Sequence, residues 1–391
     1  MPEDKPASEA DIASSTLPDA KKRPLSRRLL RLGLFLLYVL IIAEIGSRAY
    51  WKIKRDMPFF SGREDWYNRF YDEMKDSNVW TADLRPDNGY FDVLLLGGSA
   101  LDRIHTALGK DSRVIQERLE KFFIKSGKPG KSVRIFNLAN PGLTTRDSLI
   151  KYRVLGDAKK HFDLVIVYHG INDTRLNNCP PEKFKDDYTH GGWYEQIRRM
   201  EAQVALLPFF TLPYTIQYTV IHIMSSKKLH YYVPRHKQNP DWVAHGADIK
   251  TGRPFRRNMQ EILDLAAARS EPVLMMTFAW YVPEDYSITK CKGGQLDYAP
   301  SPAPSAVELW GSIEGVTKGL KVHNDIIRDL GDENEKMIFV DTERLIPRIG
   351  ENFNDVCHLS AAGKKLWLQE ILAAMKTRDP VRLEYLKLEL F

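Results

Sequence analysis

Five short apolar runs, separated by segments of helical periodicity, constrain the fold of this chain most strongly. The runs cover residues 91–97, 132–138, 163–170, 272–279 and 336–341, and helices are expected at 112–127, 144–161, 257–268, 306–330 and 361–375. Strands that are apolar along nearly their whole length are typical of a parallel sheet with helices on both faces. The pattern therefore predicts an α/β fold with a five-stranded parallel sheet over residues 89–378, interrupted by an insert at about 175–256.

A strongly apolar segment precedes this region. Residues 32–43 are uncharged and mostly apolar, and the segment extends to about Tyr50 if Glu44 and Arg48 lie near its edge. The longer segment approaches the ~20 residues that cross a bilayer, so residues 28–50 are expected to form a transmembrane signal anchor. A cleaved signal peptide, a twin-arginine export signal and a buried amphipathic helix are the alternatives.

Charge predicts the orientation of this anchor. Basic residues cluster on its N-terminal side, namely Lys21, Lys22, Arg23, Arg27, Arg28 and Arg31, and such a cluster keeps an N-terminus in the cytoplasm. The remaining chain would then be extracytoplasmic. Residues 1–27 are expected to be a disordered basic tail, 51–88 a linker or N-terminal extension, and 379–391 a C-terminal tail.

Composition excludes several functional classes. The net charge is +6, but residues 32–391 carry 50 basic and 46 acidic residues, so no clustered basic surface for nucleic acid is expected. Cys179, Cys291 and Cys357 are too few and too scattered for a disulfide framework or for a zinc site with paired spacing.

Polar residues follow four of the predicted strands, at the edge where open parallel sheets bind ligands. They are Ser99, Gly142, Asn172 and the pair Asp355 and His358. Ser99 could act as a nucleophile, His358 as its base, and Asp355 as the group that orients the imidazole. The backbone amides of Ser99 and Gly142 and the side-chain amide of Asn172 could stabilise an oxyanion. Gly97 and Gly98 would let the chain turn tightly so that Ser99 is presented at the strand end.

Each of these residues also has a structural interpretation when taken alone. Ser99 and Asp102 fit a helix capping box, and Gly98 with Ser99 could be a fragment of a phosphate-binding loop, although no Gly-Lys-Ser/Thr follows. Asn172 could lie in a simple turn, and His358 in a loop before a helix capped by Ser360. Taken together at one sheet edge, the residues favour a serine hydrolase.

Four sequence blocks resemble the SGNH (GDSL-type) hydrolases. They are "VLLLGGSA" with Ser99, "NLANPGLTT" with Gly142, "YHGINDT" with Asn172, and "DVCHLSAAG" with Asp355 and His358. The resemblance implies a flavodoxin-like three-layer α/β/α sandwich, a Ser99–His358–Asp355 triad, an oxyanion hole of Ser99, Gly142 and Asn172, and no metal or cofactor. Gly98 departs from the family motif, which usually has aspartate at this position.

The resemblance implies an ester hydrolase that removes an acyl group, O-acetyl groups included, from a glycan, a lipid or a small ester. An acyltransferase that uses the same residues on a polysaccharide, and a catalytically degenerate glycan-binding protein, are the alternatives. The oligomeric state stays open.

The insert contains a second apolar stretch. Residues 204–224 lack Asp, Glu, Lys and Arg. A second membrane span would need a return crossing that no later segment is apolar enough to supply. Packing on the flank of the domain, or an apolar lid or membrane-facing lip beside the site, are the remaining interpretations. Cys179 and Cys357 could form a disulfide if the domain is exported, and otherwise stay free thiols.

Overall fold

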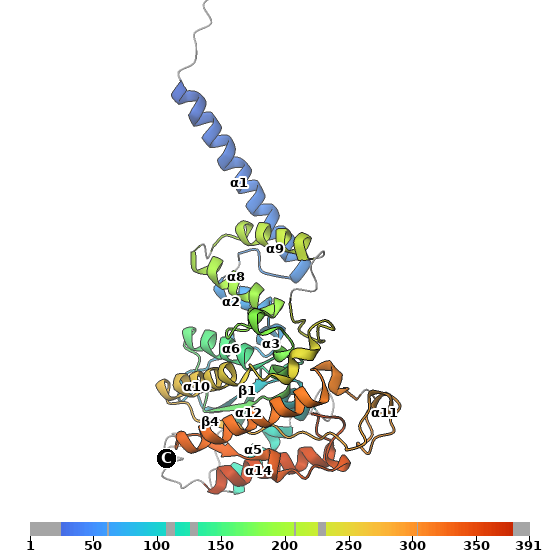
Figure 1. The fold of residues 1–391 in the computed structure, drawn as a ribbon. Coiled ribbons are helices and arrows are strands. Elements are labelled where there is room, and N and C mark those ends of the chain that lie inside the picture. Colours follow the sequence, from blue (N-terminus) through green and yellow to red (C-terminus); the bar gives the residue numbers. More distant parts are fainter. Residues whose placement is uncertain are drawn as a thin grey trace, which may run out of the picture.

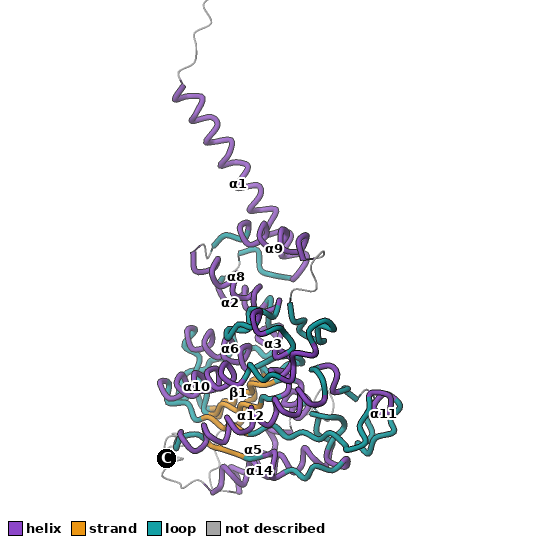
Figure 2. The backbone as a smooth tube through the Cα atoms, in the orientation of Figure 1, coloured by secondary structure: helices purple, strands orange, loops and turns teal. Residues whose placement is uncertain are grey.

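A parallel five-stranded sheet lies at the centre of the protein (Figures 1 and 2). The computed structural model describes residues 25–60, 62–106, 114–125, 132–206, 209–225, 232–302 and 304–377. The strands are β1 (Tyr90–Gly97), β2 (Ser132–Asn137), β3 (Leu164–Tyr168), β4 (Val273–Met276) and β5 (Ile338–Val340), in the spatial order β2-β1-β3-β4-β5. The five predicted strands and their parallel direction are confirmed, and the order is the flavodoxin-like one.

Both faces of the sheet are covered, because the central strands β1, β3 and β4 are apolar on both sides. Leu94 and Leu96 of β1 face one core, and Val93 and Leu95 face the other. Figure 1 shows α6 (Thr145–Asp157) and α10 (Gly252–Ala268) on one side of the sheet, with α5 (Val114–Lys125) and α14 (Ala361–Thr377) on the other. The three-layer α/β/α arrangement is therefore confirmed.

The predicted helices are present with shifted ends. The helix expected at 306–330 begins later, as α12 (Ile313–Glu333), because Gly311 has φ +152° and the Ser312 side chain accepts a hydrogen bond from Gly315 N at 3.1 Å. The helix expected at 257–268 begins earlier, at Gly252. Short helices complete the domain, namely α4 (Ser99–His105), α7 (Ile171–Thr174), α11 (Ile288–Lys292) and α13 (Thr342–Leu345).

Residues 51–88, expected to be a linker or extension, pack into the core. They contain α2 (Arg63–Asn68) and α3 (Asp72–Asp76), and their buried side chains include Trp66, Tyr71 and Met74. Glu73 Oε1 lies 2.9 Å from Nζ of Lys151, a fully buried lysine of α6. The segment is thus fixed to the sheet layer by apolar burial and a buried ion pair.

One helix, α1 (Leu25–Arg55), projects away from the domain (Figure 1). It is long and apolar enough to cross a membrane, with a mean hydropathy of 2.2 in its most apolar window, none of which is buried. The insert contributes α8 (Gly192–Leu206) and α9 (Leu212–Ser225), and α9 crosses the base of α1. The expected tails lie outside the described residues, apart from positions 25–27 at the start of α1.

Candidate active site

Ser99 begins α4 immediately beyond β1, and its side chain is 8% exposed. Gly98 has φ −95° and ψ −163°, extended values that any residue adopts, so the turn itself does not require glycine at 98. An added Cβ there would lie 2.5 Å from Asn172 Nδ2. Gly98 is therefore favoured by the limited space beside Asn172, not by backbone freedom.

Ser99, His358 and Asp355 form one hydrogen-bonded chain. Ser99 Oγ lies 2.8 Å from His358 Nε2, and His358 Nδ1 lies 2.7 Å from Asp355 Oδ2. Because the carboxylate can only accept, Nδ1 carries the imidazole proton and Nε2 accepts from the Ser99 hydroxyl. This arrangement can take up the hydroxyl proton when Ser99 attacks an electrophile.

Asp355 is held ionised although it is completely buried. Its oxygens accept hydrogen bonds from the backbone N–H groups of Cys357 at 3.0 Å, His358 at 2.9 Å and Ser305 at 2.9 Å. Burial alone would raise the pKa of Asp355, but the bonds from His358 and from these N–H groups outweigh burial and hold the pKa below its usual value. The charge that orients and stabilises the imidazole is therefore present at neutral pH.

The structure also tests the structural interpretations of Ser99 and of the segment around Asn172. Gly98, not Ser99, caps α4, without a side-chain cap bond, and Asp102 accepts from Asn137 Nδ2 at 3.0 Å, so no Ser99–Asp102 capping box forms. Asp173 accepts from Thr145 Oγ1 at 2.6 Å, and desolvation raises its pKa to about 7. Asp173 is thus a buried packing group, whereas Asn172 Nδ2 lies against Gly98, next to Ser99.

The Asn172 side-chain amide is fixed at both ends. Its Oδ1 accepts from Trp310 Nε1 at 2.8 Å, and its Nδ2 donates to Leu143 O at 2.8 Å. An amide nitrogen has two N–H groups, and among the described residues only the Leu143 carbonyl accepts from it. Since Nδ2 also lies against Gly98, the second N–H is close to the Ser99 turn.

Gly142 follows β2 at the same sheet edge and has φ +78°, a left-handed conformation that favours glycine. An added Cβ would lie 2.7 Å from both Cε1 and Nδ1 of His236, a residue of the insert. The structure therefore joins Ser99, His358 and Asp355 by hydrogen bonds, puts Asn172 against Gly98, and links Gly142 to them through its neighbour Leu143, whose carbonyl accepts from Asn172. His236 of the insert lies against Gly142.

Sequence reasoning missed the residues that support these five. Trp310 and Ser305 lie in an irregular segment before α12, and Arg103 Nη1 lies 3.9 Å from Asp355 Oδ2. His236 comes from the insert. Trp310 falls within the helix expected at 306–330, and the other three belong to no motif, so the sequence carried no signal for their contacts with the site.

The donor atoms of Asp355, Cys357 and His358 lie within 4.8 Å of one another, a spacing that a metal ion could bridge. The chemistry of these donors does not suit a metal, because His358 Nδ1 already bonds to Asp355 and burial raises the pKa of the Cys357 thiol well above its usual value. All three cysteines are free and buried, so Cys179 and Cys357 form no disulfide.

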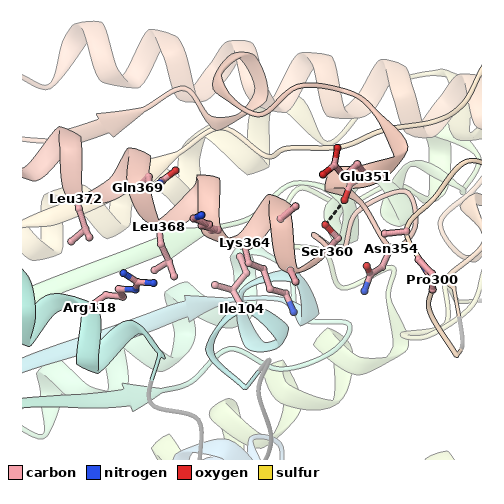
Figure 3. Close-up of a pocket in the computed structure, with 14 residues that line it drawn as sticks. Ile104, Arg118, Pro300, Glu351, Asn354, Ser360, Lys364, Leu368, Gln369 and Leu372 are labelled. Carbon is pink, nitrogen blue, oxygen red and sulfur yellow. Dashed lines mark hydrogen bonds between the residues drawn. The ribbon is translucent and has the colours of Figure 1, made fainter.

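A cavity of about 630 Å³ lies beside the start of α14, next to Asn354 and Ser360 (Figure 3). Its lining comes mainly from α4, α5, α14 and the segments around Pro300 and Asn354, and it includes Ile104, Leu368 and Leu372. None of the five candidate site residues lines it. The cavity is therefore separate from the hydroxyl of Ser99.

No protein-family model matches the chain, and no similar sequence is found among curated proteins. Solved structures of similar fold include a GDSL-like lipase from Bacteroides thetaiotaomicron, with 12% identity, a TM-score of 0.41, and coverage of 78% of this chain and 98% of the other. An acetylxylan esterase from Geobacillus stearothermophilus has 13% identity, a TM-score of 0.38, and coverage of 75% and 96%. A lipase/acylhydrolase from Enterococcus faecalis has 15% identity, a TM-score of 0.37, and coverage of 73% and 96%.

Proposed function

We propose that this chain is a membrane-anchored serine ester hydrolase with its catalytic domain outside the cytoplasm. The observation that carries the proposal is the hydrogen-bonded chain from Ser99 through His358 to Asp355, at 2.8 and 2.7 Å, at the carboxyl edge of a parallel sheet. An oriented base beside a hydroxyl is the arrangement that nucleophilic catalysis requires.

The reaction begins when Ser99 Oγ attacks the carbonyl carbon of the ester while His358 Nε2 takes the hydroxyl proton. The carbonyl oxygen becomes an oxyanion, and the resulting imidazolium is stabilised by the Asp355 carboxylate. When the bond to the alcohol breaks, His358 returns the proton to that alcohol and the acyl group remains on Ser99. His358 then activates water, which releases the acid and restores the hydroxyl.

The oxyanion is stabilised by N–H groups that are already in place. We assign this role to the backbone amides of Ser99 and Gly142 and to the second N–H of Asn172. The bonds from Asn172 to Trp310 and Leu143 support the assignment, because a donor that is fixed before the reaction needs no reorganisation in the transition state.

The substrate is an acyl ester, O-acetyl groups included, of a glycan, a lipid or a small alcohol. The anchoring supports this class, because a domain tethered outside the cytoplasm meets lipids and polysaccharides. Hydrolysis rates measured on esters of graded chain length would identify the acyl group. Rates with and without an added alcohol acceptor would separate hydrolysis from acyl transfer.

Fluorophosphonate labelling tests the mechanism directly. We expect the wild-type protein to be labelled and the Ser99→Ala variant to be unlabelled and to lose nearly all esterase activity while keeping the wild-type melting temperature. If the variant keeps more than a few per cent of the wild-type turnover, Ser99 is not the nucleophile.

Orientation has its own test. The basic cluster before the apolar part of α1 supports a cytoplasmic N-terminus. A C-terminal reporter that is active only in the cytoplasm should therefore be silent, and an active reporter would reverse the proposed topology.

A further inference from the structure

The surface around α9 is apolar on its outer side. Tyr214 of α9 is buried and Tyr218 is partly buried against the core, whereas Ile216 and Val220 point outward and are exposed. Four phenylalanines of two neighbouring loops are exposed as well. We call this set the α9 platform: Phe59, Phe60, Phe209, Phe210, Ile216 and Val220. A surface helix of a water-soluble domain normally carries polar residues outward, so the platform is an apolar patch of the kind that contacts a membrane or a partner.

Hydrogen bonds fix α9 to the C-terminal part of α1. Glu44 accepts from the backbone N–H groups of Thr211 at 2.9 Å and Leu212 at 2.8 Å. Ser47 Oγ lies 2.6 Å from Thr215 Oγ1, which also accepts from Trp51 Nε1 at 2.7 Å. The two helices therefore keep one mutual position.

Arg48 ties the two phenylalanine loops to the same place. Its guanidinium donates to Glu44 at 2.8 Å, to the carbonyl of Phe59 at 2.7 Å, and to the carbonyl of Phe209. The platform is therefore bonded to Glu44 and Arg48, so its depth in a membrane follows from theirs.

The length of α1 determines that depth. Residues 32–43, between Arg31 and Glu44, rise about 18 Å at 1.5 Å per residue, and the hydrocarbon core of a bilayer is about 30 Å thick. The span therefore has to include Glu44 and continue to about Arg48 or Trp51. The first turn of α9, which is bonded to Glu44, then lies about 6–10 Å inside the outer edge of the hydrocarbon region, since Glu44 is four to seven residues before the end of the span.

We propose that the α9 platform is inserted into the outer interface of the bilayer. The protein then contacts the membrane through α1, which crosses it, and through α9, which lies along its surface. This inference rests on the proposed crossing of α1. Lipid is the occupant because the platform is bonded to Glu44 and Arg48, which lie in the part of α1 that the bilayer has to include. Two attachments prevent the catalytic domain from swivelling on a single helix. The lid interpretation of residues 204–224 gains no support, because the insert residue that covers Gly142 is His236 and α9 packs on α1.

The test measures the membrane depth of single cysteines in the full-length protein. Phe210→Cys and Val220→Cys report on the platform, and Ile349→Cys is the matched control, since these side chains are 51%, 49% and 49% exposed. Leu37→Cys reports on the middle of α1. Each variant is labelled with an environment-sensitive fluorophore and reconstituted alone into phosphatidylcholine liposomes with and without nitroxide lipids. Wild-type protein, with its buried cysteines, gives the background labelling.

We expect blue-shifted emission and strong nitroxide quenching at positions 37, 210 and 220, and neither at 349. If 37 is quenched while 210 and 220 behave like 349, α1 spans the membrane and the platform proposal is wrong. That outcome also covers a platform that binds another protein, because lipid is the only partner present. If 37 is not quenched, the proposed anchoring itself fails.

Discussion

Two carboxylates, the buried Asp355 at the sheet edge and the partly buried Glu44 in α1, are held by similar hydrogen bonds but have different neighbours. Each accepts backbone N–H groups and one cationic or imidazole side chain. The bonds of Asp355 lead through His358 to the hydroxyl of Ser99, whereas those of Glu44 end in the first turn of α9. Two carboxylates with similar hydrogen bonds thus differ in what their partners contact next.

The largest expected effect on turnover comes from changing Asp355 and not Glu44. Asp355→Asn keeps the shape but removes the charge that fixes the His358 tautomer, and we expect turnover to fall by about 10⁴-fold with little change in KM. Steady-state kinetics on a short-chain ester would measure this. A loss below tenfold would mean that Asp355 does not orient His358.

The next effect concerns the oxyanion. Asn172→Ala removes one fixed donor, so turnover should fall by roughly 10²- to 10³-fold while KM changes little. A rise in KM at constant turnover would instead make Asn172 a ground-state binding residue.

Acid should weaken the catalytic domain through histidines that are buried in the neutral form. Desolvation lowers the pKa of His169 to about 3 and those of His190 and His323 to about 4. Their stabilising contribution is complete above the unfolded value of about 6.5 and is lost as the pH falls towards 4. Asp173, with its pKa raised to about 7, contributes oppositely: its contribution is present at low pH and is lost as the pH rises from about 4 to 7.

The three histidines outnumber Asp173, so the unfolded state binds about two more protons than the folded state near pH 5. We therefore expect the free energy of unfolding, measured by urea titration, to be highest near neutrality and to decrease on acidification. His323→Gln should reduce the pH slope by about one proton. A pH-independent free energy of unfolding would contradict this prediction.

Trp310 should have a smaller, purely positioning effect. Trp310→Phe removes the N–H that holds Asn172 Oδ1, and we expect turnover to fall by about tenfold, the equivalent of ~1.4 kcal/mol. In the Asn172→Ala background the same change should have no further effect on turnover. An additive loss in the double variant would mean that Trp310 acts independently of Asn172.

The smallest expected effect on turnover is that of changing Glu44. Glu44→Gln weakens charge-assisted bonds to α9, which are worth about 1.5–3 kcal/mol each with full charge, but it leaves Ser99 and its partners untouched. Turnover on a soluble ester should stay at the wild-type value while the melting temperature in detergent falls. Lower turnover at an unchanged melting temperature would show that the base of α1 affects the site.

The two carboxylates also show which parts of the structure could be predicted from the sequence. Asp355 and His358 are three residues apart, and Ser99, Gly142 and Asn172 each follow an apolar strand, so local patterns and strand direction located them. Glu44 bonds to residues 167 and 168 positions away, beyond any local pattern. The core packing of residues 51–88 and the start of α12 were missed for a related reason, since aromatic burial and the φ of Gly311 depend on tertiary contacts.

The separation between Glu44 and its partners has a consequence for biosynthesis. At about 5–20 residues per second, the chain between Glu44 and Thr211 takes roughly ten to thirty seconds to be synthesised. During that interval α1 can enter the bilayer, but the amides that finally satisfy Glu44 do not yet exist. Arg48, one helical turn away at 2.8 Å, is the partner that α1 itself supplies. This ion pair therefore neutralises the charge of Glu44 until α9 has been synthesised.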